Sequence, residues 1–158
     1  MQIGIITDSH DNRERIHAAV EIFNQRKVDR VIHAGDLVAP FTMDEFQHLT
    51  MPITCVFGNN DGERIGLKYK FKDIYPPPLE QEIDGHSVVV MHEPDCLEAV
   101  VSSGKYRVVI YGHTHAVDIR TDGPTIVINP GESCAWLTGK AHVAIWDTET
   151  MQVEHIEI

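Results

Sequence analysis

Two residues with the chemistry of metal ligands lie close to the N-terminus. Asp8 and His10 follow the apolar run of residues 2–6. Side chains two residues apart in an extended segment point the same way, so we expect the carboxylate and the imidazole to converge at the end of a strand. Mixed oxygen and nitrogen donors suit a divalent transition metal. The sequence therefore predicts part of a metal site here, and the remaining ligands must come from elsewhere in the chain.

Further candidate ligands follow other apolar runs. Taken singly, each has an ordinary alternative, because Asn is common in turns and a lone His is more often hydrogen-bonded within the fold. The run Gly112-His113-Thr114-His115 is a stronger signal, since it places two imidazoles two residues apart. The joint occurrence of these residues at successive strand ends predicts one shared site. Its members beyond the first pair are Asp36, Asn59, His92, His113 and His115.

Strands and helices alternate in the first half of the chain. We expect strands over residues 2–6, 28–34 and 52–57, separated by helices. This order predicts parallel strands joined by right-handed crossovers. Ligands of such sheets bind beyond the carboxyl ends of the strands, which is where Asp36 and Asn59 lie.

Capping residues indicate where the helices begin. Asp11 or Asn12 would cap the first helix. Thr42 would cap a short second helix, and Asp95 a later one that stops at Gly104. The first helix has apolar residues at helical spacing, which are Ile16, Ala19, Val20 and Phe23.

The second half of the chain predicts hairpins. Asp84-Gly85, Asp122-Gly123 and the segment before residue 152 are the expected turns. Residues 62–78 have no clear period, and we expect a loop with at most one helical turn and a solvated lysine edge there. The expected strands are residues 79–83, 87–91, 107–111, 117–120, 125–128, 142–147 and 152–156, with a loop at 129–133.

Composition limits the class of protein. A length of 158 residues and an apolar content of 42% suit a single domain covering residues 1–158. We expect no membrane span and no signal peptide. The three cysteines are Cys55, Cys96 and Cys134, which are too far apart for a thiolate metal site and indicate a reducing, cytoplasmic environment.

The formal net charge is −11. An acidic surface repels polyanions, so we expect no long nucleic acid partner. Two bound divalent cations would offset this charge locally, which leaves room for a small phosphate substrate. A homo-oligomer stays open at this point.

The combined motifs resemble one known family. Asp8-x-His10, Gly35-Asp36, Gly58-Asn59-x-Asp61, His92 and Gly112-His113-Thr114-His115 resemble the calcineurin-like metallophosphoesterase superfamily. The short chain and the Asn129-Pro130-Gly131 loop resemble its small single-domain YfcE-like phosphodiesterase branch. The resemblance runs from residue 3 to about residue 133. It implies an α/β fold with four αββα layers, in which two mixed β-sheets pack face to face and the helices lie outside.

The resemblance also implies ligands and a reaction. The first metal would be bound by Asp8, His10, Asp36 and His115, and the second by Asp36, Asn59, His92 and His113. Both ions would be divalent, with manganese expected first and zinc, iron, nickel or cobalt as alternatives. A metal-bridging hydroxide would attack the phosphorus of a small phosphodiester in line. We predict that His10, Asn60 and Asp61 take part in catalysis.

Two positions depart from the family pattern. Asn60 stands where many larger relatives have His, and an amide cannot protonate a leaving group. Glu93 stands where Gly is common, and it is either an outer partner of a ligand or a solvated side chain. No Arg lies at a motif end to bind a dianionic phosphate, which favours a diester. The alternative is a protein-interaction scaffold like the retromer subunit of this fold, whose metal positions are eroded; intact Asp36 and Asn59 argue against it.

Overall fold

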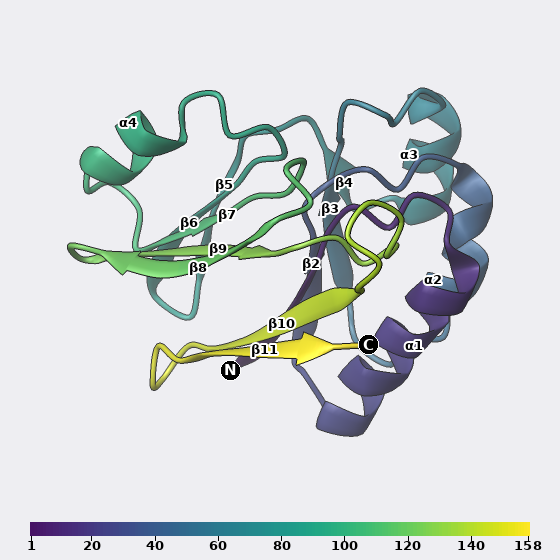
Figure 1. Cartoon of the computed structure of the whole chain (residues 1–158), viewed down its shortest axis with the longest axis horizontal. Helices are drawn as coiled ribbons and strands as arrows, with labels where there is room; N and C mark the ends of the chain where they lie inside the picture. The colour runs from purple at the N-terminus through teal and green to yellow at the C-terminus, as the bar shows by residue number, and fades with distance from the viewer.

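Two β-sheets form the centre of the molecule, which we describe from a computed structural model of residues 1–158. One sheet has six strands in the order β11-β10-β1-β2-β3-β4, and the other has five in the order β5-β6-β7-β9-β8. The two sheets and the helices outside them are visible in Figure 1. The predicted four-layer fold with two mixed sheets is confirmed.

The six-stranded sheet holds the first four strands and the last two. They are β1 (Gln2–Ile6), β2 (Arg30–His33), β3 (Ile53–Val56), β4 (Ile74–Tyr75), β10 (His142–Asp147) and β11 (Val153–Glu157). Strands β1 to β3 pair in parallel, as predicted. Strand β4, which was not predicted, adds to β3 in parallel, and β10 and β11 pair antiparallel.

The five-stranded sheet is built from the middle of the chain. Its strands are β5 (Leu79–Ile83), β6 (His86–Val90), β7 (Val108–Ile110), β8 (Val117–Asp122) and β9 (Thr125–Pro130). Two hairpins flank the parallel strands β6, β7 and β9. Asn129 and Pro130, which we expected in a loop, are the last residues of β9.

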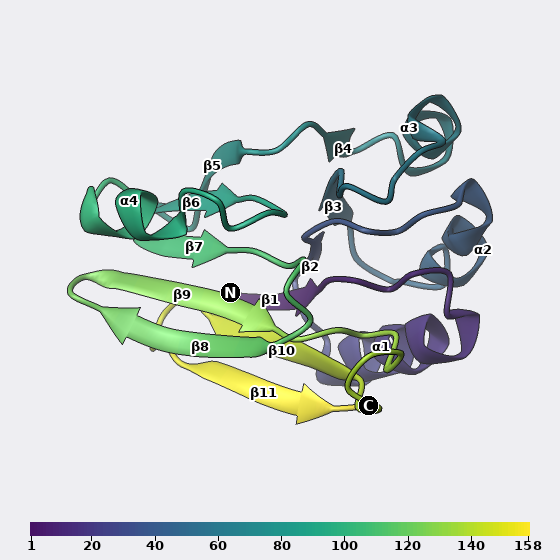
Figure 2. The same cartoon turned by 45° about the horizontal axis from the view of Figure 1, so that its top comes forward.

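The helices cover the outer faces of the sheets. The helical segments are α1 (Arg13–Arg26), η1 (Pro40–Thr42), α2 (Met43–Phe46), α3 (Arg64–Phe71) and α4 (Leu97–Ser102). Helices α1 to α3 lie on the side of the six-stranded sheet, and α4 lies beside the other sheet (Figure 2). None of these helices combines the length and the apolar content needed to cross a bilayer.

Strand alternation in β1 separates two cores. Ile3 and Ile5 are fully buried in the cluster between the sheets, and Ile6 joins the cluster under the helices. Gly4 also faces the helices, and a Cβ there would lie 2.8 Å from the ring of Phe23 in α1. Helix α1 can therefore pack directly on the backbone of β1.

A third apolar cluster lies under α4. Leu97 and Val101 of α4 pack with Val89, Val109 and Val127, the residues of β6, β7 and β9 that face away from the other sheet. This cluster completes the four layers with one short helix.

The predictions for residues 62–78 and for the cap of α4 are wrong, whereas Thr42 lies at the predicted N-cap position of α2. Residues 64–71 form helix α3, whose buried residues Leu67 and Phe71 are four apart. Asn12 does cap α1, since its side chain accepts a hydrogen bond from the Arg15 N–H at 3.3 Å. No capping hydrogen bond comes from the side chain of Thr42 at α2, and the N-cap of α4 is Cys96 rather than Asp95.

Candidate metal centre

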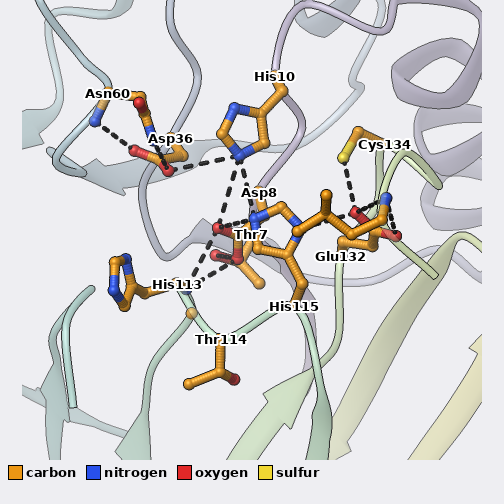
Figure 3. Close-up of polar contacts among 12 residues, drawn as sticks. Thr7, Asp8, His10, Asp36, Asn60, His113, Thr114, His115, Glu132 and Cys134 are labelled. Carbon is orange, nitrogen blue, oxygen red and sulfur yellow. Dashed lines mark hydrogen bonds and ion pairs between the residues drawn. The ribbon is translucent and has the colours of Figure 1, made fainter.

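Loops from both sheets meet at one end of the molecule. The loops after β1, β2 and β3 come from the six-stranded sheet, and those after β6 and β7 come from the other sheet. Figure 3 shows part of the resulting cluster of carboxylate, amide and imidazole groups. All seven predicted metal ligands lie in it: Asp8, His10, Asp36, Asn59, His92, His113 and His115.

One group of donor atoms surrounds the predicted first metal position. The Nε2 atoms of His10 and His115 are 3.3 Å apart. They lie 3.8 and 3.5 Å from Oδ1 of Asp8. Ligand-to-metal distances of about 2.0–2.2 Å require donor atoms separated by roughly 3–3.5 Å, so this set fits a transition metal ion.

A second group lies on the other side of Asp36. Oδ2 of Asp36 is 3.4 Å from Nε2 of His10 and 3.3 Å from Nε2 of His92. Oδ1 of Asn59 is 2.9 Å from both Nε2 of His92 and Nδ1 of His113. One carboxylate oxygen therefore faces imidazoles of both predicted ligand sets, which is the arrangement that a bridging ligand needs.

The backbone at these residues differs from what we expected. Strands β1 and β7 end at Ile6 and Ile110, so strand alternation does not explain how the ligands converge. Five of the seven predicted ligands instead have left-handed backbone conformations, which cost non-glycine residues about 1–3 kcal/mol each. The φ angles are 51° at Asp8, 38° at His10, 61° at Asp36, 69° at His113 and 58° at His115.

Two glycines let bare backbone approach the carboxylates of the predicted metal centre. A Cβ at Gly58 would lie 2.1 Å from Oδ1 of Asp36. A Cβ at Gly112 would lie 2.0 Å from Oγ1 of Thr7 and 2.8 Å from Oδ2 of Asp8. The Gly in each motif is thus required because any side chain would displace a ligand.

Hydrogen bonds orient the imidazoles. Nδ1 of His92 lies 2.8 Å from the carbonyl oxygen of Ala34. Nδ1 of His115 lies 2.6 Å from Oε2 of Glu132. With the proton held on Nδ1, Nε2 of each ring is free to bind a cation, as is usual for metal-ligating histidines.

Glu132 is a buried residue that sequence reasoning missed. Besides the contact with His115, its carboxylate accepts three hydrogen bonds. The donors are the Sγ of Cys134 at 3.1 Å, the N–H of Leu137 at 3.0 Å and the hydroxyl of Thr138 at 2.7 Å. Burial raises the pKa of Glu132, but the bonds from Thr138, His115 and Cys134 more than offset this and lower it to about 2. A fixed negative charge therefore stands behind His115.

The buried carboxylates of the centre differ in their surroundings. Burial raises the pKa of Asp8 above the usual range for a carboxyl group. Burial acts in the same direction on Asp36, but hydrogen bonds from His92 and Asn60 outweigh it and lower the pKa of Asp36. Asp36 is thus held as a carboxylate by neighbouring donors.

The residues predicted to act in catalysis lie in different surroundings. Asn60 is exposed, and its main-chain N–H and side-chain amide each donate to Asp36 at 2.8 Å. Asp61 is buried and accepts from the N–H groups of Asp36 at 3.2 Å, Val38 at 2.6 Å and Gly58 at 2.6 Å. Asp61 therefore holds the two ligand loops together, and its part in catalysis stays a prediction.

Glu93 lies at the edge of the centre. It is exposed and lines a cavity of about 190 Å³ together with His92, Asp95 and Cys96. This flank of the second ligand set carries two carboxyl groups.

Comparison with known proteins agrees with this fold. Residues 1–151 match the model of the calcineurin-like phosphoesterase superfamily domain. A phosphodiesterase of Methanocaldococcus jannaschii is 42% identical over 163 residues, which cover 99% of this chain and 98% of the relative.

Solved structures give the same result. A structure of an archaeal phosphodiesterase superposes with a TM-score of 0.95 at 42% identity, over 100% of both chains. The E. coli phosphoesterase YfcE shares the fold, with a TM-score of 0.77 at 16% identity over 100% of both chains. The chain belongs to the calcineurin-like phosphoesterase superfamily, which confirms the predicted resemblance.

Proposed function

We propose that this protein is a dinuclear metal-dependent phosphodiesterase. The observation that carries the proposal is the placement of one Asp36 oxygen 3.4 Å from His10 and 3.3 Å from His92. A shared carboxylate between two ligand sets suits two divalent cations about 3.5–4 Å apart. The phosphodiesterase relative at 42% identity supports the choice of substrate class.

The metals and the side chains around them would have different roles in the reaction. When bound, the two cations would supply charge neutralisation and activation of water for in-line attack on phosphorus. Asp8 and Asp36 offset part of the metal charge, and the neutral donors leave the centre electrophilic. Asn60, exposed beside Asp36, can donate its side-chain amide to a phosphoryl oxygen.

The choice of a diester rests on the cationic side chains near the centre. Arg64 is the arginine that follows the Gly58–Asp61 loop, and its guanidinium donates to the carbonyl oxygens of Asp61 at 3.2 Å and Gly58 at 3.4 Å. It also stacks over the ring of Phe57 at 5.2 Å. These two contacts commit part of the guanidinium to supporting the loop, which favours a diester over a phosphomonoester.

Hydrolysis of bis-p-nitrophenyl phosphate tests the proposal. We expect turnover that requires an added divalent metal, highest with Mn²⁺, and loss of turnover in Asp36→Ala. Zinc, iron, nickel and cobalt salts give the comparison series. Metal binding without turnover across phosphodiesters and phosphomonoesters would overturn the proposal in favour of the interaction scaffold.

Asn60 leads to a prediction about leaving groups. Because an amide cannot act as a general acid, we expect kcat/KM to fall steeply as the pKa of the leaving alcohol rises in a series of aryl methyl phosphates. Asn60→His should restore protonation of poor leaving groups, for which general acids contribute about 10²–10⁴-fold. Rates that do not depend on leaving-group pKa in the wild-type enzyme would refute this explanation.

Other expectations about the molecule remain proposals. The cysteines are all free thiols, with Cys55 and Cys134 buried, which supports a reducing compartment such as the cytoplasm. The net charge of −11 supports a small substrate over long nucleic acid. A single domain over residues 1–158 and a homo-oligomeric state also remain predictions.

A further inference from the structure

An exposed tryptophan lies beside the metal centre. The indole of Trp136 is 64% exposed. Its ring stacks near the imidazole of His10, with centroids 6.4 Å apart and planes inclined by 25°. The imidazole of His10 itself belongs to the ligand cluster, 3.4 Å from Oδ2 of Asp36. A large aromatic face is therefore open to solvent one side chain away from the predicted first metal.

The loop that carries Trp136 is fixed to the centre at several points. The N–H groups of Ser133 and Cys134 donate to the carbonyl oxygens of Thr7 and Asp8, both at 3.1 Å. Figure 1 shows this loop between β9 and β10 lying next to the loop after β1.

The same loop is also fixed after the tryptophan. The N–H groups of Leu137 and Thr138 donate to Glu132 at 3.0 and 2.5 Å. Before the tryptophan, the side chain of Asn12 also donates to the carbonyl oxygen of Cys134 at 2.8 Å. With anchors on both sides, the backbone of Trp136 is held in place before any ligand binds. Stacking a ligand on its ring then costs little ordering of the chain.

The two flanks of the centre differ in chemistry. The flank next to His92 is a cavity that includes Glu93 and Asp95, which disfavours an electron-rich or anionic group. The flank next to His10 has the apolar side chains of Trp136 and Leu137, which are 64% and 75% exposed. Of the two flanks, the second is therefore the one that offers an apolar surface to a planar substituent of an anionic diester.

We propose that Trp136 is a stacking platform for an aromatic or nucleobase substituent of the phosphodiester substrate. The inference rests on the proposed function and narrows its substrate class to diesters with a planar ring near phosphorus. Stacking on an aromatic side chain is tolerant of ring type, so the platform would accept purines, pyrimidines and simple aryl groups. A small nucleotide diester fits this chemistry better than an alkyl diester does.

Inhibitor binding separates the platform from the metal centre. Phenylphosphonate and methylphosphonate present the same metal-binding group, and only the first has a ring. We expect Trp136→Ala to weaken competitive inhibition by phenylphosphonate about 5- to 10-fold, the lower end of aromatic stacking energies, and to leave the inhibition constant of methylphosphonate unchanged. Trp136→Phe should retain most of the difference. Tyr69→Ala, which removes an aromatic side chain that is 80% exposed on α3, is the matched control.

Turnover provides the second measurement. Thymidine 5′-p-nitrophenyl phosphate and methyl p-nitrophenyl phosphate share a leaving group, and only the first has a base on its other ester. Trp136→Ala should raise KM for the thymidine substrate with little change in kcat, and should affect the methyl substrate less. Wild-type enzyme inactive on both substrates would refute the proposed function itself.

Other results would refute only the platform. Active enzyme with the same phenyl-to-methyl inhibition ratio in wild type and Trp136→Ala would overturn it. Intrinsic fluorescence gives a direct check, because Trp136 is exposed and Trp146 is fully buried; thymidine 5′-monophosphate should quench the wild-type signal and not that of Trp136→Phe. A change of molecular mass in light scattering for Trp136→Ala, with unchanged inhibition, would assign the ring to a contact between copies of the chain.

Discussion

Glu132 holds His115 through a 2.6 Å hydrogen bond from behind the metal centre. Outer partners of this kind typically change metal affinity by about 10- to 100-fold. We expect Glu132→Gln to weaken binding of one of the two proposed metals by that factor. The neutral amide lacks the negative charge of the carboxylate, and it turns a donor toward the N–H groups of the loop. Titration calorimetry with Mn²⁺ on metal-free protein would measure both sites.

A matched control separates this effect from general damage. Glu149 is exposed on the turn between β10 and β11, so Glu149→Gln should leave both affinities unchanged. Partial recovery in Glu132→Asp would support a role for the charge itself. Equal affinities in wild-type and Glu132→Gln protein would contradict the positioning role.

Ligand residues could be predicted from the sequence where each one directly follows a strand. Asp36, Asn59 and His92 each end a parallel strand, and the sequence order alone places such ends together. Glu132 was not predictable, because its contact with His115 spans 17 residues and depends on how the loop after β9 folds back. The position of Trp136 beside the centre likewise could not be predicted, because it depends on the loop lying beside His10.

Strand β1, which precedes Asp8 and His10, packs tightly against helix α1. Gly4→Ala in β1 would place a methyl group 2.8 Å from the ring of Phe23. Overpacking of this kind typically costs about 1–3 kcal/mol, and urea denaturation would measure the loss. Adding Phe23→Leu should recover part of the stability; a stable Gly4→Ala protein would show that α1 can move away from the strand.

The end of β2 makes stability depend on pH. His33 is fully buried, its Nδ1 accepts from the N–H of Gly35 at 3.2 Å, and its Nε2 lies 3.0 Å from Oγ of Ser9. Burial lowers the pKa of His33 to about 3, so the ring stays neutral in the folded protein and becomes protonated in the unfolded chain below about pH 6.5.

The sign of the effect follows from proton uptake. Between about pH 6.5 and 3 the unfolded state binds the extra proton, so stability falls as the pH is lowered, by up to about 1.4 kcal/mol per pH unit. We expect His33→Gln, which keeps a donor and an acceptor, to have a shallower slope than wild type. Denaturant titrations of metal-free protein at several pH values would measure it, and equal slopes would contradict the assignment.

Helix α3 was not predicted because its sequence contains two overlapping periodicities. In residues 64–72 the lysines recur every second position, which hides the spacing of Leu67 and Phe71 on one face of α3. Lys68 donates to the carbonyl oxygen of Ile74 at 2.7 Å and lies over the ring of Tyr75, so it supports the short strand β4. Such tertiary contacts cannot be found from local pattern.

At the scale of the whole molecule, metal binding should stabilise the fold. A ligand present at 100 times its dissociation constant adds about 2.7 kcal/mol per site, which for a chain of this size raises Tm by roughly 5–10 °C. Thermal unfolding with and without Mn²⁺ would measure the shift. Asp36→Ala should abolish it, and Asp44→Ala, an exposed carboxylate in α2, should not; a shift that persists in Asp36→Ala would place the stabilising ions elsewhere.

The division of the ligands between two sheets has a consequence for how the chain folds. His10 and His115, and likewise Asp8 and His113, are 105 residues apart in sequence, yet they meet at the centre. Contacts of such separation form late, because the long loop between them must first be closed. Neither sheet can assemble both ligand sets alone, so metal uptake should lag behind secondary structure in refolding and mark the moment at which the sheets have docked.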